Sequence, residues 1–165
     1  MEWLYPKDYV KTIHDIDYDK LFQMGIRGIM FDIDNTLAAF DAPYPTKEVI
    51  ALFDQLRVNG FEVCLVSNNS HKRVHKYNEK LGVAAFPRAN KPLTTNLRKA
   101  MSSMGTTTKQ TVFVGDQLFT DVWAGNAIGF RTILVKPIQD KEQLITRVKR
   151  GLEKLILKSY IKKYK

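Results

Sequence analysis

Apolar residues in this chain gather in short runs, and between them lie longer segments in which apolar positions recur every three or four residues. The short runs predict buried strands, and the longer segments predict amphipathic helices. Strands are expected at 27–33, 61–66, 83–86, 111–114 and 131–135, and helices at 46–58, 71–80, 93–104, 122–127 and 140–158. Strands that alternate with helices are typical of a parallel sheet with crossover helices. We therefore expect an α/β, Rossmann-like fold whose mostly parallel five-stranded sheet carries helices on both faces.

The rest of the chain fits one compact unit. Its 165 residues suit a single domain, 1–165, and we find no internal repeat or low-complexity linker. The segment 1–24 is expected to be a helical or irregular lead-in that covers one edge of the sheet. The lone cysteine, Cys64, lies in an apolar run, which favours a buried thiol in a reducing compartment. Since we see neither a signal peptide nor a long apolar run, we expect a cytoplasmic location.

Positive charge is concentrated near the end of the chain. The net charge is +9, and residues 141–165 carry nine basic residues against two glutamates, which is +7 of that total. A basic segment of this kind indicates an anionic partner: a membrane surface, RNA or a phosphorylated substrate. The segment 140–165 is expected to be an amphipathic helix and tail. We expect its apolar stripe (144, 145, 148, 152, 155 and 156) to pack on the sheet, with the basic face in solvent or against anionic phospholipid.

Polar residues gather just after the predicted strands. Asp32 and Asp34 end the first strand and are followed by Asn35 and Thr36. Because the carboxyl ends of parallel strands share one rim, which is where open α/β sheets bind ligands, we expect these groups to meet others there. Two carboxylates side by side suggest a site for a hard cation such as Mg²⁺. The other strand ends supply Ser67 and Asn68, Lys91, and Asp116 with Asp121.

These residues also form ordered motifs. Asp32-Ile33-Asp34-Asn35-Thr36-Leu37, then Ser67, then Lys91-Pro92, then Gly115-Asp116 with Asp121, resemble the four motifs of the haloacid dehalogenase (HAD) superfamily of phosphatases. The resemblance spans 27–135. Together with the lead-in from Tyr9 to Ile16, it is similar to the YqeG-type group, which is related to mitochondrial phosphatidylglycerophosphatases.

The resemblance implies a role for each residue. Asp32 would be the nucleophile that forms an aspartyl-phosphate. Asp34 would act as general acid and then general base, and its backbone carbonyl would join Asp32 and Asp116 around Mg²⁺. Lys91 would neutralise the phosphate. The remaining positions would support them: Asp121 and Thr36 would orient the ligands, and Ser67, Asn68 and Arg88 would bind the phosphoryl group or the substrate. The basic residues His71, Lys72, Arg73, His75 and Lys76 are expected to form a rim near the site.

The spacing of the motifs leaves no room for a cap domain. Between 37 and 61, and again between 67 and 91, only a helix and short connections are expected. An open site of this kind suits a large or anchored substrate, such as phosphatidylglycerophosphate, unless a partner in an oligomer supplies a lid. The sequence does not fix the oligomeric state. Two other functions stay open: a phosphatase for nucleic-acid or protein phosphates, and a non-catalytic RNA-binding or partner-binding protein.

Overall fold

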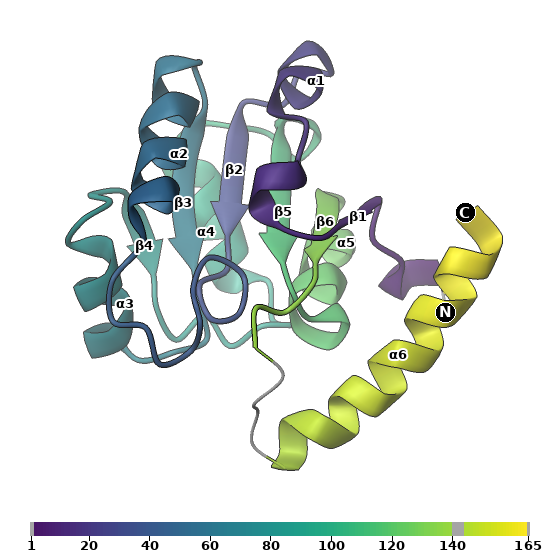
Figure 1. The fold of residues 1–165 in the computed structure, drawn as a ribbon. Coiled ribbons are helices and arrows are strands. Elements are labelled where there is room, and N and C mark those ends of the chain that lie inside the picture. The colour runs from purple at the N-terminus through teal and green to yellow at the C-terminus, as the bar shows by residue number, and fades with distance from the viewer. Residues whose placement is uncertain (1, 140–143, 165) are drawn as a thin grey trace.

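The structure, a computed structural model, describes residues 2–139 and 144–164. Its centre is a parallel sheet of six strands in the order β1-β6-β5-β2-β3-β4 (Figure 1). The strands are β1 (Asp8–Val10), β2 (Gly28–Phe31), β3 (Glu62–Val66), β4 (Ala84–Phe86), β5 (Thr111–Gly115) and β6 (Arg131–Val135). Each pair of neighbouring strands along this order is parallel. The predicted α/β, Rossmann-like fold is therefore confirmed.

The predicted number of five strands was wrong, because the lead-in contributes a sixth. β1 pairs with β6, with Tyr9 opposite Leu134. A strand of three residues is too short to produce a periodic apolar signal, so the sequence pattern did not show it. The pairing covers the outer edge of β6, which would otherwise expose unpaired backbone groups.

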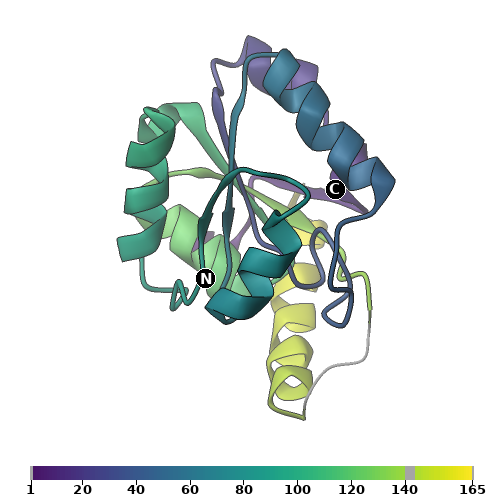
Figure 2. The same cartoon turned by 90° about the vertical axis from the view of Figure 1, so that its left-hand side faces the viewer.

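Helices lie on both faces of the sheet. They are α1 (Tyr18–Gln23), α2 (Lys47–Val58), α3 (His71–Asn78), α4 (Thr95–Met104), α5 (Trp123–Ile128) and α6 (Leu144–Tyr164), and a π-helical turn, Leu118–Val122, precedes α5. Figure 2 shows α2 on one side of the sheet and α4 on the other. Neither the loop from β2 to α2 nor the segment from β3 to α4 contains a cap domain, as predicted.

The central strand β2 contributes to both cores because its side chains alternate between the faces. Ile29 and Phe31 pack with Phe53 of α2 in one cluster. Met30 packs with Leu97 of α4 in the other. All four residues of β2 are buried. The strand that carries the first aspartate motif is thus fixed from both sides, which limits the movement of the residues that follow it.

The last helix differs from the prediction. It continues to Tyr164 rather than ending at 158, and its expected first residues, 140–143, lie outside the described residues. The apolar stripe was expected to pack on the sheet, but only Ile156 of its described side chains is buried, whereas Val148, Leu152 and Leu155 are exposed. The packed face is instead formed by Ile156, which joins a third core cluster with Leu4, Leu118, Val122 and Leu134, and by the buried Tyr160, whose ring contacts that of Tyr5. Among the described helices, none has the length and apolar character to cross a membrane.

Close packing of α5 on β6 depends on a glycine, which gives a first prediction. A Cβ atom added at Gly125 would lie 2.4 Å from Cγ2 of Thr132. We expect Gly125→Ala to lower the free energy of unfolding by about 1–3 kcal/mol, because β6 must shift to admit the methyl group.

Gly151→Ala in α6 is the control, since nothing lies within 4 Å of its added Cβ. It should raise stability by about 0.5–1 kcal/mol, because alanine favours a helix interior. Urea unfolding of both variants measures this, and equal destabilisation would contradict the packing argument.

Candidate active site

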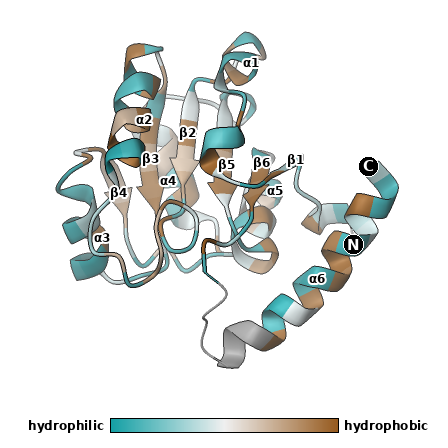
Figure 3. Cartoon of the chain, in the orientation of Figure 1, coloured by the Kyte–Doolittle hydropathy of each residue, from teal (hydrophilic) through white to brown (hydrophobic). Residues whose placement is uncertain are grey.

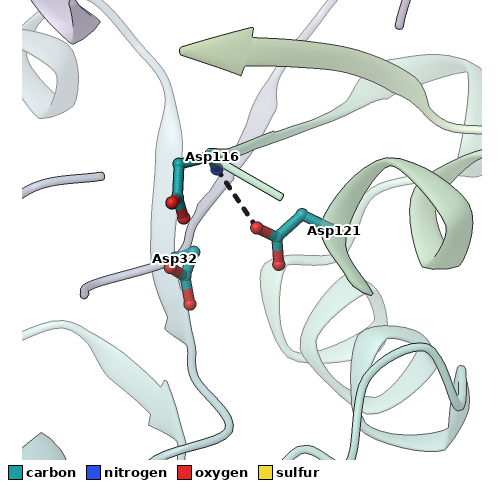
Figure 4. A group of neighbouring side chains, drawn as sticks. All are labelled: Asp32, Asp116 and Asp121. Carbon is teal, nitrogen blue, oxygen red and sulfur yellow. Dashed lines mark hydrogen bonds between the residues drawn. The ribbon is translucent and has the colours of Figure 1, made fainter. Parts of the chain in front are cut away.

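Three carboxylates converge at the carboxyl end of the sheet. Asp32 directly follows β2, Asp116 directly follows β5, and Asp121 lies in the π-helical turn. One oxygen of each lies within 4.8 Å of an oxygen of the others, and all three residues are buried. Figure 4 shows the three side chains gathered in one place. The prediction that these strand ends meet at one rim therefore agrees with the geometry.

Asp121 comes this close because the neighbouring strand ends in a glycine. A Cβ at Gly115 would lie 2.4 Å from the carboxyl carbon of Asp121, so any other residue would push the side chain away. Oδ2 of Asp121 accepts the backbone N–H of Asp116 at 3.1 Å (Figure 4) and that of Gln117, also at 3.1 Å. Asp121 therefore fixes the loop that presents Asp116.

Lys91 joins the carboxylates. Its Nζ lies 2.6 Å from Oδ1 of Asp32 and 2.7 Å from Oδ1 of Asp121, and it donates to the carbonyl of Val66 at 3.0 Å. The lysine side chain is only 2% exposed. Asn68 holds the backbone of Lys91 through two hydrogen bonds: Oδ1 of Asn68 accepts the Lys91 N–H, and Nδ2 donates to the Lys91 carbonyl.

Burial changes the protonation of these groups. It raises the pKa of Asp32 to about 7, because Lys91 offsets only part of the cost of burying the charge and Asp121 adds repulsion. Burial also raises the pKa of Asp116, with further contributions from Asp121 and Asp32. Burial alone would lower the pKa of Lys91, but the charges of Asp121 and Asp32 prevail and raise it. Lys91 is therefore a permanent cation in the site.

Asp116 has two further partners. The hydroxyl of Thr36 lies 3.3 Å from Oδ1 of Asp116 and 3.4 Å from Oδ2 of Asp32, so it connects the two carboxylates. Arg150 of α6 forms an ion pair with Oδ2 of Asp116 and donates to the Asp116 carbonyl at 2.7 Å. The predicted supporting position of Thr36 matches this placement. The sequence did not indicate Arg150 as part of the site.

Asp34 stands apart from the three gathered carboxylates. Its Oδ1 accepts from Nε and Nη2 of Arg73 at 3.3 and 3.1 Å, and its Oδ2 accepts from Asn69 at 2.9 Å. Of the basic residues on α3 that were expected to form a rim, Arg73 thus has a defined partner. A guanidinium fork and an amide together fix the direction of the Asp34 carboxylate.

A cleft of about 450 Å³ opens over these residues. Both Asp32 and Asp34 line it. Ser67 also lines it, and its buried hydroxyl accepts the N–H of Asn69 at 3.1 Å. Arg88 is exposed and is not among the lining residues, so its role toward the substrate stays a prediction. The other lining residues are Asn68, Asn69, Lys91, Gln117, Thr120 and Asp121.

Sequence reasoning placed Arg73 in a basic rim near the site but did not predict its contact with Asp34, and it missed Arg150, which contacts Asp116. Arg73 lies on the first turn of α3, which begins at His71, so its position was an available signal for the first contact. Arg150 lies 34 residues beyond Asp116 in a basic helix. No spacing rule singles it out among its neighbouring lysines.

The three gathered carboxylates of Asp32, Asp116 and Asp121 fit a divalent metal ion. Their ligand atoms are hard carboxylate oxygens, which suit Mg²⁺. Burial and mutual repulsion raise the pKa of Asp32 and Asp116, so a cation bound between them would stabilise their charged forms. The side-chain oxygens that gather belong to Asp32, Asp116 and Asp121. The predicted ligand role of Asp34 concerns its backbone carbonyl and stays a prediction.

Comparisons with known proteins agree with this geometry. Residues 88–149 match the family model described as HAD-hydrolase-like. The chain is 37% identical over 158 residues to the Bacillus subtilis protein named "Probable phosphatase YqeG", and the match covers 96% of this chain and 92% of that protein. It is 29% identical to "Phosphatidylglycerophosphate phosphatase 1, chloroplastic/mitochondrial" of Arabidopsis thaliana, across 98% of this chain but 49% of the plant protein.

Solved structures support the fold. A HAD phosphatase from Thermococcus onnurineus superposes with a TM-score of 0.58 at 13% identity, covering 72% of this chain and 90% of that one. The chain spans about half the length of the two phosphatidylglycerophosphate phosphatases that it matches. Because the identity to the Bacillus subtilis phosphatase extends over nearly the whole of both sequences, the chain belongs to the HAD superfamily of phosphatases, in the group of YqeG.

Proposed function

We propose that this protein is a Mg²⁺-dependent phosphomonoester hydrolase that acts through an aspartyl-phosphate on Asp32, and that its substrate is phosphatidylglycerophosphate. The observation that carries the chemistry is Lys91, which lies within 2.7 Å of both Asp32 and Asp121 at the floor of an open cleft. A carboxylate attacks a phosphate dianion only when positive charge offsets their repulsion. The buried ammonium supplies that charge next to the attacking atom.

The proposed reaction has two steps. An oxygen of Asp32 forms a bond to phosphorus while the bond from phosphorus to the alcohol oxygen breaks. Asp34 gives its proton to the departing oxygen, so that a neutral alcohol leaves. Water then attacks the phosphorus of the aspartyl-phosphate, Asp34 takes a proton from it, and inorganic phosphate and free Asp32 are released. Ser67 and Asn68, which line the cleft, would donate to the phosphoryl oxygens.

Asp32 and Asp116 would hold the metal ion, with the backbone carbonyl of Asp34. When bound, Mg²⁺ would withdraw electron density from a phosphoryl oxygen. Thr36 and Arg150 contact Asp116 and keep its carboxylate in place. Asp121 anchors the loop around Asp116 and, with Asp32, holds Lys91.

Three observations support the lipid substrate. The relatives from Arabidopsis thaliana and Chlamydomonas reinhardtii are named as phosphatidylglycerophosphate phosphatases. The site has no cap domain over it, which leaves room for a phosphate on a bulky lipid. The last helix is strongly basic, which favours an anionic surface.

Phosphate release is the direct test of this function. The protein should release phosphate from short-chain phosphatidylglycerophosphate with Mg²⁺ but not with EDTA, and far faster than from sugar phosphates, nucleotides, oligonucleotide phosphates or phosphopeptides. Asp32→Asn should lower kcat on the order of 10³-fold or more while the protein stays folded by circular dichroism, because the nucleophile is lost.

Three outcomes would contradict parts of this proposal. Release only from an aryl phosphate, or mainly from nucleic-acid or peptide substrates, would contradict the lipid assignment. Full activity of Asp32→Asn would refute the nucleophile, and no release from any substrate would favour the non-catalytic alternative.

The contact between Arg73 and Asp34 predicts a leaving-group effect. We expect Arg73→Gln to lower kcat roughly 10- to 100-fold on a substrate with an alkyl alcohol leaving group, since a badly oriented acid loses part of a 10²–10⁴-fold contribution. The loss should be much smaller on p-nitrophenyl phosphate, whose leaving group needs no proton. Lys72→Gln, an exposed neighbour on α3, is the control and should change neither rate. Equal losses on both substrates would assign Arg73 a merely structural role.

The raised carboxyl pKa values predict how Mg²⁺ and pH act together on stability. Because the folded pKa of Asp32 is about 7, above the ordinary value near 3.9, the metal-free fold binds protons more tightly than the unfolded chain. Proton binding to Asp32 therefore stabilises the metal-free fold at acid pH, and this stabilisation is lost as pH rises through about 7. Mg²⁺ competes with the same protons, so it should raise Tm more at pH 8 than at pH 6, by roughly 3–5 °C.

Differential scanning fluorimetry with and without Mg²⁺ measures this effect. Asp116→Asn should remove most of the Mg²⁺-dependent rise, whereas Asp54→Asn should retain it, because Asp54 is exposed on α2. An equal rise at both pH values would contradict the argument.

A further inference from the structure

The last helix, α6, has two different faces. The face toward the domain is anchored by polar and apolar contacts: Arg150 binds Asp116, Glu153 accepts the N–H of Phe119 at 3.2 Å, and Ile156 and Tyr160 are buried. These residues are spaced three or four apart, which places them on one side of a helix. The orientation of α6 is therefore set by contacts to the segment 116–119, which follows β5, and to the third core cluster.

The opposite face exposes an apolar stripe. Val148, Leu152 and Leu155 are 70%, 53% and 64% exposed, and their spacing of four and three places them on one line along the helix. Apolar and polar positions alternate along α6 in Figure 3. Large apolar side chains that gather on an exposed face mark an interaction site rather than a random surface.

Lysines border this stripe. Lys154, Lys158 and Lys162 follow one another at intervals of four, so they form a row beside Leu155. All three are exposed. An apolar stripe bordered by long basic side chains matches the boundary of an anionic bilayer, where the leucines enter the acyl region and the ammonium groups reach the phosphates.

We propose that this outer face of α6, made of Val148, Leu152, Leu155 and the bordering lysines, docks the protein on an anionic phospholipid bilayer. A second copy of the chain fits the face less well, because pairing two such faces would bring the rows of lysines together. Over its described residues α6 is not long and apolar enough to cross a bilayer, so the proposal is docking on the surface.

This surface would also orient the active site. Figure 1 shows the first turns of α6 at the end of the molecule where the β-strands finish, which is the end that carries the carboxylates. Arg150 connects the helix directly to Asp116. The value of docking for catalysis rests on the proposed lipid substrate, but docking itself can be measured without turnover.

Vesicle binding of the chain 1–165 tests the proposal. The protein should sediment with vesicles of phosphatidylcholine and phosphatidylglycerol in equal parts, and only weakly with vesicles of phosphatidylcholine alone. Leu152→Ser/Leu155→Ser should weaken partitioning roughly tenfold or more, because two apolar side chains no longer enter the bilayer. Val58→Ser is the matched control, because Val58 is 86% exposed at the end of α2 and should not contribute. Both variants should keep their rate on p-nitrophenyl phosphate, which shows that they are folded.

A local probe tests the face directly. A polarity-sensitive dye on Leu155→Cys should shift its emission to shorter wavelength when anionic vesicles are added, whereas the same dye on Val58→Cys should not. The native Cys64 is buried, so the dye reacts at the introduced thiol. No sedimentation of the wild type, unchanged partitioning of the double serine variant, or no shift at position 155 would each overturn the proposal.

Other outcomes separate the alternatives. A concentration-dependent dimer that forms without vesicles and is lost in Leu152→Ser/Leu155→Ser would assign the face to a second copy and overturn docking. Binding to vesicles without release of phosphate from the lipid would leave the docking surface and overturn the substrate. Hydrolysis of short-chain lipid in solution without vesicle binding would leave the proposed substrate and overturn the docking surface.

Discussion

The position of one buried ammonium group holds the site together. Nζ of Lys91 lies between Asp32 and Asp121 and is nearly inaccessible to solvent. Removing one member of a buried ion pair typically costs about 3–5 kcal/mol, because the remaining charge is left without a partner. Two carboxylates depend on this lysine, so its placement is a constraint on folding as well as on chemistry. The amide of Asn68 holds both backbone groups of Lys91 and so fixes where the chain presents it.

The parallel sheet explains how residues far apart in sequence meet the lysine. β2 and β5 are neighbours and end at the same edge, so Asp32 and Asp116 follow their strands side by side. Asp121 reaches them because Gly115 leaves space for its carboxyl group, and it then accepts two backbone N–H groups of the same loop. Packing, backbone hydrogen bonds and charge thus stabilise one arrangement. The negative charge that remains in it gives a divalent cation a favourable place to bind.

The sequence predicted the parts of this arrangement that depend on strand ends. Asp32, Asp116 and Lys91 each follow a strand or precede a helix, and topology brings such positions together. It could not predict contacts that depend on side-chain direction across the fold. Arg150 reaches Asp116 from a helix whose placement depends on the burial of Ile156 and Tyr160, and β1 forms because β6 offers an open edge. Both are tertiary effects with no local signal.

The same reasoning explains why the apolar stripe of α6 was assigned to the wrong face. Periodicity shows that a helix has an apolar side, but it does not say whether protein or another medium covers that side. In α6 the polar contacts of Arg150 and Glu153 to the segment 116–119 decide which face turns inward, because they place these two residues against the domain and leave Leu152 and Leu155 exposed. A helix that places its charged anchors against the domain and its leucines outside, bordered by lysines, has the surface chemistry of a bilayer contact. One helix can therefore hold Asp116 on one side, and under the proposed function it would bring the site to a lipid phosphate with the other.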